Sequence, residues 1–241
     1  MIHNLLEPHL PQLYSISSDE NVRMDVSKKI VDAIEIQKEH LHSQGISHLL
    51  SKLAENGMDM VEGKYMGKYS PERSSSCLPI AGLTILDSLL DIPETDTILK
   101  RNLINFFKKM LFINNINPCL DERTSIVIRL TVSCIGHLAR IATASESDHL
   151  KVSFLSMAFK CVIEPRSEVH RYSGLLLLTQ LAMHIPVHVY DQKQKFFDGI
   201  FDAIFDRNTI IRMGASKAFS EALKLVSERE NSEGRNEIFV C

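Results

Sequence analysis

The chain has 241 residues, with 27 Lys and Arg against 30 Asp and Glu, so its formal net charge is −3. Hydrophobic residues make up 44% and charged residues 24%, proportions that exclude a wholly disordered chain. The balanced charge argues against a nucleic-acid-binding protein, which is normally clearly basic. With 10 glycines and no Trp, the composition disfavours a loop-rich β protein or a phosphate-cradling enzyme and favours a helical protein.

The cysteines and the N-terminal residues indicate a cytoplasmic location. Five cysteines, an odd number, form no Cys-x-x-Cys pair, which is typical of a reducing compartment. The N-terminal residues lack a basic stretch followed by a long apolar core, so we expect no signal peptide. The longest strongly apolar run, around residues 174–178, falls short of the roughly 20 residues that a membrane span needs. We therefore expect no insertion into a membrane.

Apolar residues recur at helical spacing along most of the chain. Prolines and an Asn-rich stretch separate the periodic segments. We expect helices over residues 2–14, 20–42, 45–57, 74–91, 95–112, 122–142, 147–163, 168–184, 188–205 and 208–229. The segment at about 56–76 is predicted to be a long loop, and residues 230–241 a flexible or truncated tail.

An arginine recurs near the start of alternate predicted helices, at Arg23, Arg129, Arg171 and Arg212. The last three are separated by 42 and 41 residues. A period near 40 built from two helices is typical of HEAT and armadillo arrays. A single hairpin of this size cannot bury its apolar face, so the hairpins must stack. The sequence therefore predicts an all-α fold over residues 1–229, a right-handed α-solenoid of about five HEAT-type helical hairpins in an armadillo-like superhelix.

Each repeat also has expected structural positions. Acidic residues before the second helices can cap their free N–H groups, namely Asp19, Asp121 and Asp206. An arginine in a first helical turn is unfavourable for the helix dipole. We therefore predict that each repeated arginine pairs with the acidic turn residue of an adjacent repeat, the alternative being an exposed arginine without a specific partner. In the last repeat, small residues occupy expected structural positions at Gly214, Ala215 and Ala218, and the two alanines should face the first helix of their own repeat, where small side chains allow close helix approach.

Four segments together resemble the N-terminal HEAT array of the target-of-rapamycin (TOR) serine/threonine kinase family, among the PI3K-related kinases. They are residues 171–182 (RYSGLLLLTQLA), 196–206 (FFDGIFDAIFD), 211–215 (IRMGA) and 227–230 (SERE). The chain departs from the family pattern at Lys195, Met213 and the Ser173-Gly174 pair. It also lacks the glycine-rich, lysine-strand and catalytic-loop motifs of kinases.

The resemblance implies a non-catalytic scaffold for protein–protein interactions in nutrient and growth signalling complexes. It implies adaptor subunits such as Raptor and the small GTPase Rheb as partners, and a location in the cytoplasm and peripherally at lysosomal or endomembrane surfaces. An alternative is an independent HEAT-repeat adaptor, importin-like or phosphatase-scaffold-like, unrelated to TOR signalling.

No catalytic, cofactor-binding or metal-binding residues are predicted, and no small-molecule substrate. His184 and His188 have metal-ligand spacing, but Pro186 interrupts the helix between them. A cluster of basic residues is interpreted as a solvated helix face, formed by Lys100, Arg101, Lys108 and Lys109.

Overall fold

The computed structural model describes residues 20–64, 77–112 and 120–238, together with Pro8 and Pro11. Within these ranges every regular element is a helix and none is a strand, in agreement with the predicted all-α class. The helix expected over 2–14, apart from Pro8 and Pro11, and part of the expected loop, residues 65–76, lie outside the described residues. The chain divides into two compact units, Met1–Phe106 and Phe107–Cys241, and each is described by itself.

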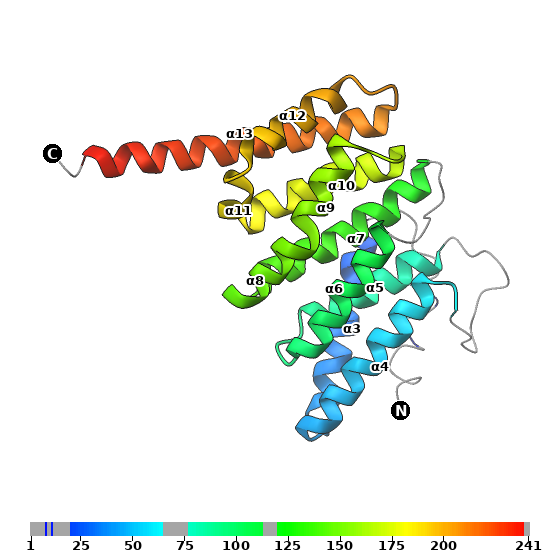
Figure 1. Ribbon diagram of the computed structural model, residues 1–241. Coiled ribbons are helices and arrows are strands. Elements are labelled where there is room, and N and C mark those ends of the chain that lie inside the picture. The colour runs from blue at the N-terminus through cyan, green and yellow to red at the C-terminus, as the bar shows by residue number, and fades with distance from the viewer. Residues whose placement is uncertain (1–7, 9–10, 12–19, 65–76, 113–119, 239–241) are drawn as a thin grey trace. The chain divides into compact units, whose positions relative to one another are not determined.

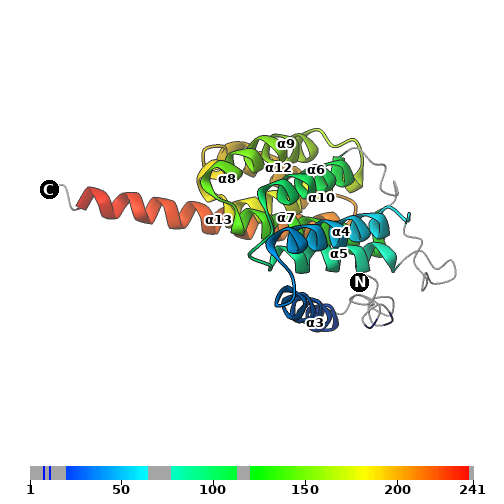
Figure 2. The same ribbon diagram turned by 90° about the horizontal axis from the view of Figure 1, so that it is seen from below.

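The first unit contains α3 (Glu20–Lys38), α4 (Ser43–Val61), α5 (Leu78–Leu90) and most of α6 (Thr97–Phe112). Helix α5 packs against both α3 and α4 (Figures 1 and 2). All residues of α5 except Pro79 and Asp87 are buried, as expected of a helix enclosed by neighbours. A Cβ atom at Gly82 would lie 2.4 Å from the carbonyl oxygen of Gly57, so only glycine fits where α4 and α5 cross.

The second unit contains two long helices and several shorter ones between them (Figure 1). They are α7 (Glu122–Ile141), α8 (Ala144–Leu150), the π-helical turn η1 (Lys151–Leu155), α9 (Ser156–Ile163), α10 (Glu168–His184), α11 (Pro186–Tyr190), α12 (Lys193–Ile204) and α13 (Thr209–Ile238). Helix α10 contacts α7, α9 and α13, and α12 contacts α9 and α13. The α12–α13 hairpin therefore packs on the preceding hairpin formed by α9 and α10.

Aromatic and small side chains hold these two hairpins together. The fully buried Phe196 of α12 meets Phe159 of α9 edge to face, with 6.4 Å between ring centroids. A Cβ atom at Gly199 would lie 2.5 Å from Cγ1 of Val162, so the backbone of α12 comes close to α9 at this glycine. Phe107 of α6 is also fully buried.

Several buried hydroxyl groups bond within their own helix. Thr131 donates to the carbonyl of Val127, and Thr179 donates to that of Leu175. Thr84 and Ser173 make the same bond four residues back, to the carbonyls of Ile80 and Val169. These side chains thus satisfy their hydrogen-bonding groups without a partner on a neighbouring helix.

Several predicted boundaries differ from the structure: the helix expected over 20–42 ends at Lys38, and the one expected over 147–163 begins at Ala144 and is divided into α8, η1 and α9. Helix α4 continues to Val61 instead of giving way to a loop near 56, because Gly57 serves close packing and the helix ends only near Gly63, at φ 70°. The helix expected over 188–205 is two helices, α11 and α12, separated by a turn at residues 191–192. Helix α13 runs to Ile238, so residues 230–238 of the expected tail are helical.

Among the described helices, α7 has the length and apolar composition to cross a membrane, and 56% of that stretch is buried in the structure. A buried core helix meets the same criterion. Pro186 does end α10, since α10 stops at His184 and α11 begins at the proline.

Candidate interaction surface

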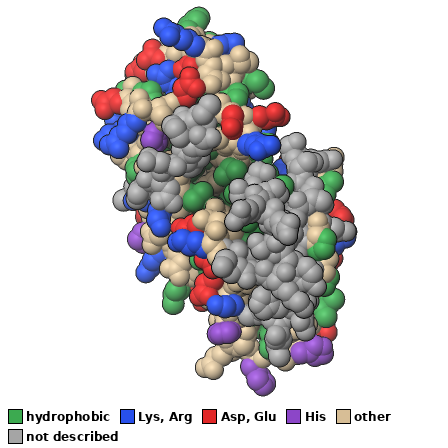
Figure 3. All heavy atoms as spheres, turned by 90° about the vertical axis from the view of Figure 1, so that its right-hand side faces the viewer, with side chains coloured by type: hydrophobic (Ala, Val, Ile, Leu, Met, Phe, Trp, Pro, Cys, Tyr) green, Lys and Arg blue, Asp and Glu red, His purple; other side chains and the backbone are tan. Residues whose placement is uncertain are grey.

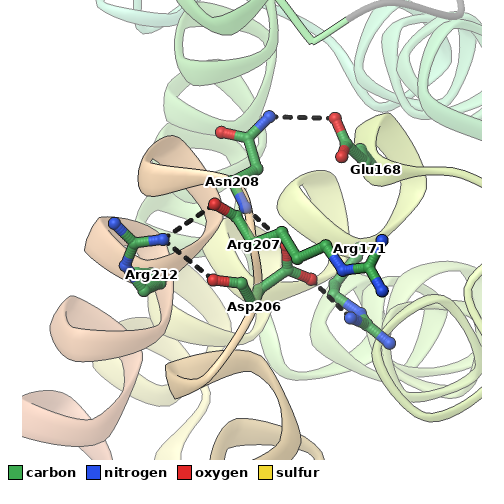
Figure 4. A network of polar contacts seen from close by, with 6 residues as sticks. All are labelled: Glu168, Arg171, Asp206, Arg207, Asn208 and Arg212. Atoms are coloured by element: carbon green, nitrogen blue, oxygen red, sulfur yellow. Dashed lines mark hydrogen bonds and ion pairs between the residues drawn. The ribbon is translucent and has the colours of Figure 1, made fainter.

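A polar network joins the first turn of α10 to the turn between α12 and α13 (Figure 4). Nη1 of Arg171 donates to the Asp206 carboxylate across 35 residues of sequence, at 2.5 Å. Beside it, the Asn208 amide donates to the Glu168 carboxylate, at 2.9 Å. The predicted pairing of a repeated arginine with the acidic turn residue of the next hairpin is therefore present at Arg171 and Asp206.

Arg212 occupies the same fourth position of α13 as Arg171 does in α10. Its Nη1 donates to the backbone carbonyls of Asp206 and Arg207, and its Nη2 donates to the hydroxyl of Thr209. Arg212 thus stabilises the turn before its own helix rather than a contact with an adjacent repeat (Figure 4).

Asp206 is the centre of this network. Burial disfavours its charged form, but the backbone N–H of Asn208 and the guanidinium of Arg171 outweigh burial and lower the pKa of Asp206 below its ordinary value. Asn208 in turn accepts a hydrogen bond from the N–H of Ile210 at the start of α13. The turn residue Asn208 therefore caps α13, and Asp206 in the same turn forms the ion pair with Arg171 of α10.

The other predicted repeat positions are placed differently. Asp121 caps α7 as expected, because its carboxylate accepts from the N–H of Thr124, which lowers the pKa of Asp121. Arg23 lies in the first turn of α3, and its Nε is buried without a hydrogen-bond partner. Asp19 lies outside the described residues.

Arg129 does not lie in a first turn, contrary to the prediction. Helix α7 begins at Glu122, so Arg129 is its eighth residue, and its side chain is exposed. A shift of one turn leaves a residue on nearly the same helix face, so a sequence period alone does not fix the position along the helix.

The small residues of α13 lie in the core. A Cβ atom at Gly214 would lie 3.1 Å from the Tyr172 ring of α10, and Ala215 and Ala218 are fully buried. Gly214 and Ala218 are one turn apart on the same face, which is the face toward α10. The close approach at Gly214 is thus made to α10 of the preceding repeat.

The outer side of the α12–α13 hairpin carries a group of aromatic residues that are not among the predicted repeat positions. The rings of Phe197, Phe201 and Phe219 contact one another, with centroids 5.8 to 6.3 Å apart. Phe205 and Leu223 extend this surface and are exposed. The spacing 197, 201, 205 was the available signal, since it places an apolar stripe beside the buried one formed by residues 196, 200 and 203.

Charge on the molecular surface is mixed. On the face in Figure 3, Lys and Arg side chains are interspersed with Asp and Glu among the described residues. Of the predicted basic cluster on α6, Arg101 and Lys109 are exposed, while Lys100 and Lys108 are half-buried.

No family model matches the chain. It is 28% identical over 134 residues to the serine/threonine-protein kinase mTor of Drosophila melanogaster, a match that covers 56% of this chain and 5% of that protein. It is 27% identical over 109 residues to the serine/threonine-protein kinase TOR of Arabidopsis thaliana, covering 45% of this chain and 4% of that protein. The chain thus has a distant, partial similarity to TOR kinases and matches about a twentieth of their length.

Proposed function

We propose that this chain is a non-catalytic scaffold for protein–protein interactions, equivalent to part of the N-terminal HEAT array of a TOR kinase. In this proposal its hairpins follow one another as a right-handed α-solenoid, and the chain acts in nutrient and growth signalling complexes. The observation that carries the proposal is the Arg171–Asp206 ion pair, which links successive hairpins at the position where the arginine recurs.

The packing of the second unit supports a repeat array. Helix α10 contacts both the preceding α7 and the following α13, so these three helices are neighbours in chain order. Arrays of this kind present extended surfaces to protein partners, and their stability comes from contacts between neighbouring repeats. The partial similarity to two TOR kinases favours this role over that of an importin-like or phosphatase-scaffold-like adaptor.

The proposed partners are adaptor subunits such as Raptor and the GTPase Rheb in its GTP-bound form. The proposed location is the cytoplasm, with peripheral association to lysosomal or endomembrane surfaces through these partners. Because a short array offers only part of a shared interface, we expect affinities of micromolar order or weaker.

Calorimetric titration of the full chain with GTP-loaded and GDP-loaded Rheb, and copurification with Raptor, test the proposal. We expect weak binding that prefers the GTP form, with an unrelated small GTPase as the negative control. If the folded chain, verified by circular dichroism, binds neither protein at high micromolar concentration, the TOR assignment is wrong.

A kinase assay tests the non-catalytic part separately. The purified chain should transfer no phosphate from ATP to protein substrates. Turnover that disappears when a residue of this chain is substituted would overturn that part of the proposal.

A further inference from the structure

We draw no further inference here: the strongest candidate, the patch of aromatic side chains on the outer side of the α12–α13 hairpin formed by Phe197, Phe201, Phe205 and Phe219, carries none because nothing in the described part of the chain shows what covers it.

Discussion

Arg171 and Asp206 connect two hairpins through one ion pair, in which the acidic turn that caps α13 also receives the guanidinium of α10. The Asp206 side chain is 9% exposed and that of Arg171 26%. The contact therefore fixes how far α13 is displaced along α10, while the surrounding apolar residues supply most of the attraction.

A double-mutant cycle should detect this coupling. Arg171→Met and Asp206→Asn should each lower the free energy of unfolding by about 1–3 kcal/mol, because each leaves a partly buried charged group without its partner. The double variant should lose less than the sum of the two single losses. Urea denaturation measures all three values, and strictly additive losses would show that the two residues are not coupled.

Gly82→Ala should strongly destabilise the first unit. The new methyl group would lie 2.4 Å from the backbone carbonyl oxygen of Gly57, so α4 and α5 must separate, at a cost of about 3 kcal/mol. Gly45→Ala is the control, because its methyl group meets only the side chain of Leu41, and alanine favours the helix by up to about 1 kcal/mol. Equal urea midpoints for the two variants would mean that the helix crossing is looser than described.

Stability should decrease as the pH falls from 7 to 5. Burial, with the nearby charges of Arg140 and His137, lowers the pKa of His184 below its ordinary value. The unfolded chain then binds more protons than the folded chain, so the free energy of unfolding is highest above the unfolded pKa of about 6.5 and falls below it. Burial lowers the pKa of His170 in the same sense.

Thermal unfolding of the His184→Asn variant at several pH values measures this contribution. The variant should show a smaller decrease between pH 7 and pH 5 than the native chain. Replacement of the exposed His40 by Asn should leave the decrease unchanged. A decrease of native size in the His184 variant would exclude this histidine as a source of the pH dependence.

Ala218→Leu should destabilise the α13 packing by about 1–3 kcal/mol, since Ala218 is fully buried and the larger side chain must displace its neighbours. Lys224→Ala, at an exposed position of the same helix, should change the free energy of unfolding by less than about 0.5 kcal/mol. Chemical denaturation at a concentration where the chain is monomeric compares the two. Similar effects would mean that the buried face of α13 is assigned wrongly.

The helical architecture was predictable because apolar spacing and breakers are local signals. Pro186 ends α10 as expected, and Asp121 caps α7 as expected. The role of Gly57 was harder to predict. Glycine is common in loops, but Gly57 lies inside α4 and allows close packing against Gly82, which is 25 positions away in the sequence.

The candidate site was predictable only in part. Arg171 and Asp206 were identified by their recurrence and their turn chemistry, although the pairing itself depends on how the hairpins stack. Arg129 was assigned to the wrong turn because a period fixes the face of a helix but not the position along it. The aromatic group on the outer side of α12 and α13 was not predicted, because Phe197 and Phe201 have the spacing of additional core residues and only their exposure distinguishes them.

The buried hydroxyl groups have a consequence for how this sequence can diverge. Thr131, Ser173 and Thr179 bond to carbonyls of their own helices, so replacement by an apolar residue of similar size strands no partner elsewhere. Each of these hydroxyl residues can therefore be replaced independently, whereas a substitution of Arg171 or Asp206 leaves the other residue of the ion pair without its partner.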